Sequence, residues 1–296
     1  MNNKYNDIRL AVICGDMRML YCARELAGRG FEVGFYGFEN TGADCGDAVR
    51  CRTVEDAVKG ASAVILPVPL SRDGVRVNAP FCREELRLDR LMDLIQPTQL
   101  VLAGVCRPSF LSAAEESSLT VVDYMKDEEL TVKNAVTTAE GTLELAMREL
   151  PVTVNGLQTL VLGYGRVGKT VAAAFSALNA KVTVCARRTD ALAWAFAAGH
   201  ETAKMKDICR AVQGKALIIN TVPAQVLDNN VLSFASNDAL VIDLASAPGG
   251  VDIEAAFRLG IKTVHALSLP GKTAPLTAGT DIADAAAAIM ERRGVI

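Results

Sequence analysis

The feature that most constrains the fold is an apolar strand that leads directly into a glycine-rich turn and then into a helix. The strand is Thr159–Leu162, the turn has the spacing G-x-G-x-x-G, and Val167–Leu178 is an apolar helical pattern without proline. The first glycine of such a turn allows a tight bend, the second lets a pyrophosphate approach the backbone, and the third lets the helix pack on the strand. Free amides at the helix start bind the phosphates. The pattern predicts a dinucleotide site built from Gly163, Tyr164, Gly165, Arg166, Val167 and Gly168, with a turn that serves packing alone as the alternative.

The charge after the next strand indicates which dinucleotide is bound. Lys181–Cys185 ends about twenty residues past the glycines, where an NAD enzyme places an acid on the ribose 2′-hydroxyl. This chain has Arg187 and Arg188 there instead, and guanidinium groups bind phosphate through paired donors. We therefore expect NADP(H) in preference to NAD(H); NAD(H) stays open if the arginines only belong to a solvated loop.

Strands and helices alternate along the whole chain. The first half has expected strands at Ile8–Cys14, Phe31–Phe38, Ala63–Pro67, Gln99–Ala103 and Leu119–Asp123, and helices at Met17–Ala27, Arg83–Ile95 and Phe110–Ser117. The second half has expected strands at Thr159–Leu162, Lys181–Cys185, Ala216–Asn220, Ala239–Leu244 and Thr263–His265. This order predicts an α/β fold with two doubly wound parallel-sheet, Rossmann-like domains linked by an interdomain helix.

The domain organisation follows from this alternation. We expect an N-terminal Rossmann-like substrate domain over 1–126 and an interdomain helix over 127–150 that spans the cleft between the domains. Helical apolar spacing supports that helix, and Pro151 ends it. An NAD(P)-binding Rossmann domain follows over 151–280, and a C-terminal helix over 281–296 packs back across the domains.

Length and composition exclude several classes of protein. The 296 residues suffice for two domains with separate cores. A net charge of −3, with no basic run longer than two residues, argues against nucleic acid as a partner. Without a signal-peptide pattern or a stretch of about twenty apolar residues, we expect no membrane association and a cytoplasmic location. Eight scattered cysteines and two histidines suggest no disulfide framework and no metal site.

Ligands of doubly wound sheets bind beyond the carboxyl ends of the strands, so the residues just after each strand are candidates for function. In the second half, Thr221, Val222 and Pro223 are expected on the nicotinamide side of the cofactor, and Ala245 is a further expected cofactor-binding residue. For Thr221, simple turn chemistry is an equal alternative.

Four further residues are candidates for catalysis. Lys272 lies in a segment rich in turn formers and could neutralise a substrate carboxylate, while His265 ends a strand and could accept a proton. Thr138 and Glu140 could act as hydrogen-bond donor and base beside Gly141, which interrupts a helical pattern. The alternatives are a surface lysine, a structural histidine and a threonine that caps the helix.

Binding of a small dicarboxylate requires cations, and the first half offers two arginines that follow strands. Arg18 and Arg107 are candidate clamps, with Asn134 of the interdomain helix as a third substrate-binding residue. An arginine at such a position more often starts a helix or forms an ion pair, but the location of both at strand carboxyl ends favours ligand binding.

Several short motifs, in this order, resemble the family of the dehydrogenase-like A subunit of dipicolinate synthase over nearly the whole chain. They are G-D-x-R at 15–18, N-A-V-T-T-A-E-G at 134–141, L-V-L-G-Y-G-R-V-G at 160–168, A-R-R at 186–188, I-N-T-V-P-A at 219–224, I-D-L-A-S-x-P-G-G at 242–250 and L-P-G-K-x-A-P-x-T-A-G at 269–279. The family usually has a second glycine where this chain has Cys14, and proline-threonine where it has Thr137 and Thr138.

The resemblance implies the dehydrogenase-like member of a two-subunit enzyme, whose partner is a flavoprotein-like B subunit. It further implies oxidation of dihydrodipicolinate to dipicolinate in the mother cell of a sporulating bacterium, a reaction that the arginine pair predicts to be NADP-linked. A homo-oligomer is a further option. Two other functions stay open. One is a stand-alone NADP-dependent 2-hydroxyacid or shikimate-type dehydrogenase, whose histidine–acid or lysine–aspartate pair is not evident here, and the other is a nucleotide-binding regulatory role.

Overall fold

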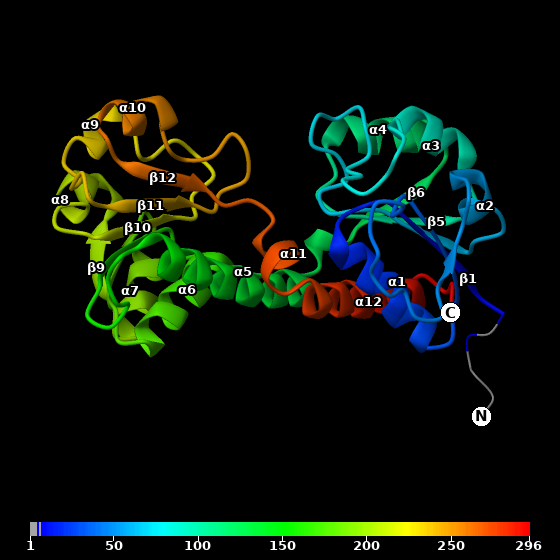
Figure 1. The fold of residues 1–296 in the computed structure, drawn as a ribbon, viewed down its shortest axis with the longest axis horizontal. Helices are drawn as coiled ribbons and strands as arrows, with labels where there is room; N and C mark the ends of the chain where they lie inside the picture. Colours follow the sequence, from blue (N-terminus) through cyan, green and yellow to red (C-terminus); the bar gives the residue numbers. More distant parts are fainter. Residues whose placement is uncertain (1–4, 6) are drawn as a thin grey trace. The chain divides into compact units, whose positions relative to one another are not determined.

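The computed structural model describes Tyr5 and residues 7–296, which divide into two compact units (Figure 1). The first unit runs to Asn134 and also contains Ala274–Ile296, and the second is Ala135–Thr273. Each unit has a six-stranded sheet in which every pair of neighbouring strands is parallel. The expected α/β fold with two Rossmann-like sheets is therefore confirmed.

The sheet of the first unit has the strand order β3-β2-β1-β4-β5-β6. Its strands are β1 (Arg9–Ile13), β2 (Glu32–Tyr36), β3 (Val49–Arg50), β4 (Ala63–Ile65), β5 (Leu100–Ala103) and β6 (Thr120–Asp123). Its helices are α1 (Met17–Gly28), α2 (Val54–Val58), α3 (Leu88–Leu94), α4 (Pro108–Glu116), the 3₁₀ turn η1 (Tyr124–Lys126) and α12 (Pro275–Arg292). The chain passes to the second unit within α5 (Glu128–Glu149).

The second unit repeats the same winding, with the order β12-β11-β10-β7-β8-β9. Its strands are β7 (Gln158–Leu162), β8 (Lys181–Ala186), β9 (Glu201–Lys204), β10 (Leu217–Asn220), β11 (Leu240–Asp243) and β12 (Lys262–His265). Its helices are α6 (Arg166–Ala177), α7 (Thr189–Ala197), η2 (Met205–Asp207), α8 (Ile208–Ala211), α9 (Asn229–Leu232), α10 (Ile253–Arg258) and α11 (Leu269–Thr273).

Both faces of each sheet are buried, which is why the central strands are apolar throughout rather than alternating. In β1, Leu10 and Val12 face one apolar cluster, while Ala11 and Ile13 face another on the opposite side. The second sheet divides in the same way, with Val161 on one side and Leu160 on the other. Each unit is thus a sheet between two helical layers, and its ligand site is expected at the carboxyl ends of the strands.

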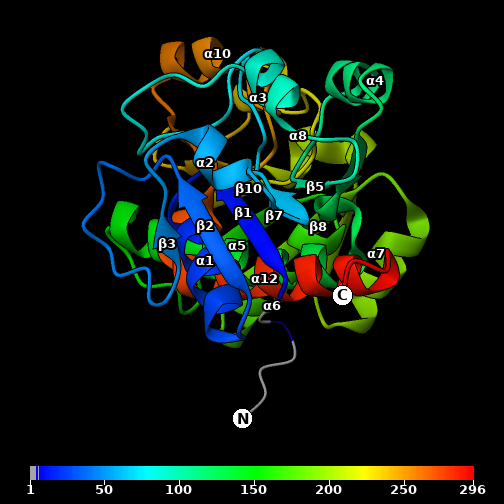
Figure 2. The same ribbon diagram turned by 90° about the vertical axis from the view of Figure 1, so that its right-hand side faces the viewer.

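The C-terminal helix α12 packs on α1 in the first unit, on the helical layer beside strands β1 and β2 (Figure 2). Gly279 allows the close approach, because a Cβ there would lie 2.5 Å from the Arg18 carbonyl oxygen and 2.7 Å from the Tyr21 Cβ. Arg29 of α1's C-terminal cap also forms an ion pair with Asp284 (2.5 Å). The apolar face of α12 therefore completes the core of the first unit.

Some elements differ from those expected from sequence. The helix expected at Arg83–Ile95 starts only at Leu88, because residues 83–86 form bends and irregular backbone and Arg87, which is extended, bridges Arg76. Strands β3 and β9 were not predicted; β9 reads ETAK, a polar edge strand without an apolar pattern. The turn-rich segment after His265 contains the short helix α11, and α12 begins at Pro275 rather than at 281, since proline is well tolerated in a first helical turn.

Candidate functional site

Each glycine of the predicted dinucleotide turn has a distinct environment. Gly163 has φ +91° and lies against Thr221, whose Oγ1 would be 2.5 Å from an added Cβ. Gly168 is buried under the turn, and a Cβ there would lie 2.9 Å from the Gly163 carbonyl carbon. By contrast, a Cβ on the exposed Gly165 would meet no atom within 4 Å. The first and third glycines are therefore required by the protein itself, whereas the space above the second is available to a ligand.

Helix α6 begins at this turn without a side-chain cap, because its N-cap residue is Gly165. The uncapped end of a twelve-residue helix presents amide donors and the positive end of the helix dipole to the space above Gly165. An anion such as a pyrophosphate is the ligand this end would bind best.

A groove of about 760 Å³ runs from this turn along the second unit. It is lined by Gly163, Tyr164, Gly165, Arg166, Lys169, Ala186, Arg187, Arg188, Asp190, Ala191, Trp194, Met205, Val222, Pro223, Ala224 and Val226. The groove thus contains four of the six residues of the predicted glycine turn, both predicted arginines, and Val222 and Pro223. Val167 packs toward the core, and Gly168 lies beneath the turn.

The two arginines lie at the end of β8 but have different surroundings. Arg187 is exposed and lines the groove. Arg188 is the N-cap residue of α7 and forms an ion pair with Asp190, which also lines the groove. This ion pair holds the pKa of the Asp190 carboxyl below its usual value. Arg187 is therefore the more available donor for a phosphate, because the Arg188 guanidinium already has a carboxylate partner.

Sequence reasoning missed several residues that line the groove. Trp194, the only tryptophan of the chain, is 67% exposed on α7. Lys169 lies one residue beyond the last glycine, with its Nζ 5.9 Å from the centre of the Tyr164 ring. The available signal was that both residues belong to the helices that directly follow the glycine turn and the arginine pair. Together they add an aromatic surface and a cation to the walls of the groove.

A buried polar pair fixes the loop that forms the opposite wall. Asn220 and Asp243 end the neighbouring strands β10 and β11, and the Asn220 Nδ2 donates to Asp243 Oδ1 at 2.8 Å. Asn220 also bonds the amide and the carbonyl of Val222, both at 3.0 Å. Asp243 accepts hydrogen bonds from the amides of Ala245 (3.1 Å) and Gly250 (2.8 Å). Because both buried side chains have these partners, the pair holds Val222 rigidly in the groove wall.

The framework around the Asn220–Asp243 pair also includes three of the predicted site residues: Thr221, Ala245 and His265. The Thr221 Oγ1 donates to the Leu162 carbonyl at 2.7 Å and so closes the end of β7 beside Gly163. Ala245 is buried and does not line the groove. Its carbonyl oxygen lies 3.0 Å from the Nε2 of His265. Because a carbonyl only accepts hydrogen bonds, Nε2 carries a proton and His265 positions the loop after β11.

Helices α5 and α11 meet at Gly141. A Cβ at Gly141 would lie 2.7 Å from the Thr273 Oγ1 and 3.0 Å from the Leu269 Cβ, so only glycine allows this approach. Glu140 and Lys272 are each adjacent in sequence to a residue of this contact, and both are exposed. Two segments about 130 residues apart, each carrying one of the predicted catalytic residues, are thus in contact within the second unit.

The threonine pair of α5 does not cap a helix. Thr138 lies in the interior of the 22-residue α5, which Gly141 does not interrupt, so the alternative that Thr138 caps a helix is wrong. Its carbonyl accepts a hydrogen bond from the Thr142 Oγ1 at 2.7 Å. Asn134 is half-buried on the same helix. The contact with α11 explains why a glycine is present in the middle of this helix.

The two candidate arginines of the first unit are bound to protein groups. Arg18 is 4% exposed; its guanidinium pairs with Asp16 (2.7 Å) and donates to the Val68 carbonyl at 2.6 Å. Arg107 is exposed but donates to the carbonyls of Arg72 (2.5 Å) and Asp73 (3.2 Å). Arg18 therefore ties the turn after β1 to the loop after β4, and Arg107 is the more accessible of the two.

Among Tyr5 and residues 7–296, no group of three or more histidine, cysteine, aspartate or glutamate side chains is arranged to hold a metal ion. No helix in that part of the chain is long and apolar enough to cross a membrane.

Comparison with known proteins gives two family matches. Residues 9–125 match the N-terminal domain of the A subunit of dipicolinate synthase, and residues 134–273 match the NAD-binding domain of S-adenosyl-L-homocysteine hydrolase. The second match covers the glycine turn and the groove. The second unit is therefore similar to a known NAD-binding domain, in agreement with its geometry.

Whole-chain comparisons agree with the first match. The dipicolinate synthase A subunit of Bacillus subtilis (strain 168) is 33% identical over 279 residues, which is 94% of this chain and 94% of that protein. The crystal structure of the A subunit from Bacillus halodurans superposes with a TM-score of 0.86 at 30% identity, over 96% of this chain and 98% of that one. The crystal structure of the Bacillus subtilis protein gives 0.85 at 31% identity, over 99% and 98%.

Proposed function

Because this chain belongs to the family of dipicolinate synthase A subunits, we propose that it is the dehydrogenase component of such a synthase and binds NADP(H) in preference to NAD(H). The observation that carries the proposal is the open space above Gly165, at the uncapped start of α6 and in a groove that also contains Arg187. A pyrophosphate fits that space, and a 2′-phosphate would meet the Arg187 guanidinium. NAD(H) would leave Arg187 without this partner.

The residues of the groove fit a dinucleotide along its length. The amides of the glycine turn would bind the pyrophosphate, Arg187 would bind the adenosine phosphate, and Trp194 offers a flat apolar surface for a base. Val222 and Pro223, fixed by the Asn220–Asp243 pair, would bound the nicotinamide side. A bound nicotinamide would supply the acceptor for a hydride.

The reaction we propose is oxidation of dihydrodipicolinate to dipicolinate. Its substrate is a ring with two carboxylates, and the oxidation also releases a proton, so the protein must supply a cation and a base. Within the second unit, we assign carboxylate binding to Lys272 and proton acceptance to Glu140. They flank the contact between α11 and α5, and neither forms part of the buried framework. His265 and Thr138 are weaker candidates, because His265 holds the Ala245 carbonyl and Thr138 lies within the helix.

In the first unit, Arg107 is the better candidate for a substrate carboxylate, and Arg18 acts by positioning. Arg18 is buried with donors committed to Asp16 and Val68, so it fixes the turn that follows β1. Asn134 stays a candidate for substrate binding. We further propose that the chain acts together with a flavoprotein-like B subunit in the cytoplasm of the mother cell of a sporulating bacterium.

The single tryptophan makes cofactor binding directly measurable. Because Trp194 lines the groove, its fluorescence should be quenched on titration with NADPH and, more weakly, with NADH. Arg187→Ala should weaken NADPH binding at least about tenfold and leave NADH binding within about threefold, since one charge-assisted phosphate contact contributes about 1.5–3 kcal/mol. Lys181→Ala, an exposed cation at the start of β8, is the matched control. Equal affinities for the two cofactors, unchanged by Arg187→Ala, would sink the NADP(H) preference.

Turnover distinguishes a catalytic role from a regulatory one. The chain is assayed for dipicolinate formation with NADP⁺, alone and with the purified flavoprotein-like partner, starting from freshly generated dihydrodipicolinate. Cofactor reduction in step with product formation supports the proposed dehydrogenase. Cofactor binding without reduction in both mixtures would instead favour the regulatory alternative.

A further inference from the structure

A second cluster of reactive groups lies at the carboxyl edge of the first sheet. Cys14 directly follows β1, is fully buried, and has φ +60°, a conformation that favours glycine. This is the position at which the family usually has a glycine. The Cys14 amide donates to the Tyr36 carbonyl at the end of β2 (2.7 Å), and its Sγ would lie 2.6 Å from a Cβ on Gly37. The extra side chain therefore occupies space between the ends of β1 and β2.

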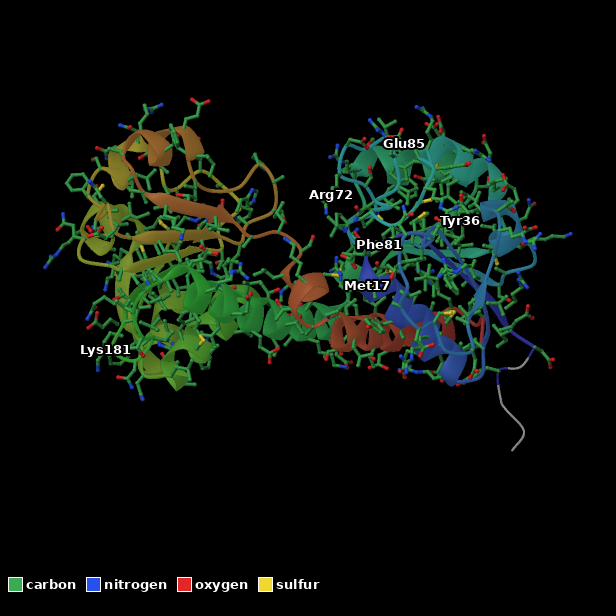
Figure 3. All side chains as sticks on the ribbon, viewed as in Figure 1. Met17, Tyr36, Arg72, Phe81, Glu85 and Lys181 are labelled. Carbon is green, nitrogen blue, oxygen red and sulfur yellow. The ribbon has the colours of Figure 1, made fainter. Side chains whose placement is uncertain are left out.

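The loop that carries Cys82 is tied to the same edge. The Asn40 amide donates to the Phe81 carbonyl at 3.0 Å. The Glu39 carboxylate accepts hydrogen bonds from the amides of Gly37 (3.3 Å) and Arg83 (3.2 Å). Figure 3 shows Tyr36 and Phe81 in this part of the first unit, above Met17 of α1. Three segments distant in sequence are thus joined around the thiols of Cys14 and Cys82, which pack in one apolar cluster.

Three groups in this region act on the thiol of the half-buried Cys82 through hydrogen bonding. They are the thiol of Cys14, the backbone amide of Glu84 and the hydroxyl of Tyr36. Hydrogen bonds to a thiolate stabilise the charged form, and here they outweigh the burial and the nearby Glu39 carboxylate, both of which oppose it. The Cys14 hydrogen bond is the largest contribution, and together the donors lower the pKa of the Cys82 thiol to about 7.

Cys14 and Tyr36 stay protonated and so remain donors. The hydrogen bond to Cys82 and burial both raise the pKa of Cys14 well above its ordinary value. Burial and the neighbouring Cys82 raise the pKa of Tyr36. The charged groups that act on the cluster are Glu39 and, through Tyr36, Arg90 of α3. Near neutral pH a substantial fraction of Cys82 is therefore thiolate, beside a protonated Cys14.

We propose that Cys82 and Cys14 form a redox-active thiol pair, in which Cys82 is oxidised by a hydroperoxide and Cys14 resolves the product to a disulfide. In the first step the Cys82 thiolate attacks the peroxide: the O–O bond breaks, an S–O bond forms, and one water leaves from hydrogen peroxide after uptake of a proton. In the second step the Cys14 sulfur displaces the oxygen from the Cys82 sulfenic acid, and that oxygen leaves as a second water with the Cys14 proton. Two thiols and one hydrogen peroxide thus give one disulfide and two waters.

Other half-buried cysteines of the chain provide internal controls. Burial raises the pKa of Cys51, and raises that of Cys106 to about 12. A limiting amount of iodoacetamide at pH 7, followed by peptide mass spectrometry, should label Cys82 at least about tenfold faster than Cys51 or Cys106, because the thiolate is the nucleophile. The rate at Cys82 should rise with pH through a midpoint near 7. In Tyr36→Phe, which removes one donor, the midpoint should move upward.

The disulfide itself is tested with two variants of the full-length chain. After hydrogen peroxide treatment and blocking of remaining thiols, digestion should yield a Cys14–Cys82 linked peptide that dithiothreitol separates. Cys14→Ser keeps a hydroxyl donor but cannot form the bond, so Cys82 should remain readily alkylated and stop at the sulfenic acid, trapped by dimedone. Cys14→Ala should lose fast alkylation as well. If Cys82 alkylates no faster than Cys51 and Cys106, or if the linked peptide is absent after peroxide treatment, the thiol pair is refuted.

Discussion

The glycine turn contains one glycine proposed to bind the cofactor, Gly165, and one required for packing, Gly168. Substitutions at the two positions therefore test the two roles separately. Gly165→Ala places a methyl group where no protein atom lies within 4 Å, at a residue with extended backbone (φ −82°, ψ −161°) that alanine adopts freely. Gly168→Ala places the same group against the backbone of Gly163, 2.9 Å from its carbonyl carbon. We expect the first variant to lose the cofactor and the second to lose stability.

The magnitudes follow from these contacts. At Gly165 the weaker N-cap preference of alanine and the reduced entropy of the unfolded chain nearly cancel, so the free energy of unfolding should change by less than about 1 kcal/mol. The methyl group would still displace the pyrophosphate from its amide donors. Loss of one charge-assisted hydrogen bond weakens binding at least about tenfold. At Gly168, forced movement of the backbone should cost about 1–3 kcal/mol, or roughly 4–12 °C in Tm for a unit of this size.

Two measurements decide between the roles. Thermal unfolding followed by circular dichroism gives Tm for both variants, and quenching of Trp194 gives their affinity for NADPH. A Gly165→Ala variant that keeps the wild-type Tm and binds NADPH within threefold of wild type would refute a pyrophosphate at this residue. A Gly168→Ala variant as stable as wild type would refute the packing role assigned to the third glycine.

Three further changes test the groove, the proposed catalytic lysine and a buried histidine. Asp190→Asn removes the carboxylate that pairs with Arg188, so NADPH binding should tighten about threefold to tenfold while NADH binding stays constant. Quenching of Trp194 fluorescence measures both affinities. Equal tightening for both cofactors would contradict a role for Arg188 in binding the phosphate. Lys272→Ala should raise KM or lower kcat for dihydrodipicolinate oxidation at least tenfold, about 1.4 kcal/mol or more, with Lys181→Ala as control; unchanged kinetics would remove Lys272 from the site. Burial lowers the pKa of His200, whose Nδ1 lies 3.2 Å from the Ser176 Oγ, so its contribution to stability is complete above the unfolded pKa of about 6.5 and is lost as pH falls below it. Tm should therefore fall more steeply between about pH 7.5 and pH 5 in the wild type than in His200→Gln, and parallel curves would contradict this.

The parts of the fold that could be predicted from sequence are those that depend on local pattern. Apolar runs bounded by glycine and proline identify the central strands, and the strand–turn–helix order gives the parallel winding. The surroundings of Gly163, Gly165 and Gly168 follow from backbone geometry within one turn, which is why the groove lies where the sequence places it. Strand β9 was missed because an edge strand with a polar sequence has no pattern to distinguish it from a loop.

The remaining features depend on contacts between distant segments. Gly141 reads as a helix interruption until α11 is seen packed against it. Arg18 reads as an available cation until its burial against Asp16 and Val68 is known. Trp194 lines the groove only because of the face that α7 turns toward it. Asn220 and Asp243 form a hydrogen-bonded pair only because β10 and β11 pair in register. Such relations are properties of the tertiary structure, and no single segment contains them.

The division of the chain into units has a consequence for the order in which they form during synthesis. The second unit is one continuous stretch, whereas the first is completed by α12, whose apolar residues fill the core beneath α1. Ala135–Thr273 is translated before α12, the helix that completes the core of the first unit. During that time the apolar face of α1 is uncovered, while the second unit is already able to fold. We therefore expect the nascent chain to be most exposed to aggregation in its first unit, which is completed only by a helix translated after the whole second unit.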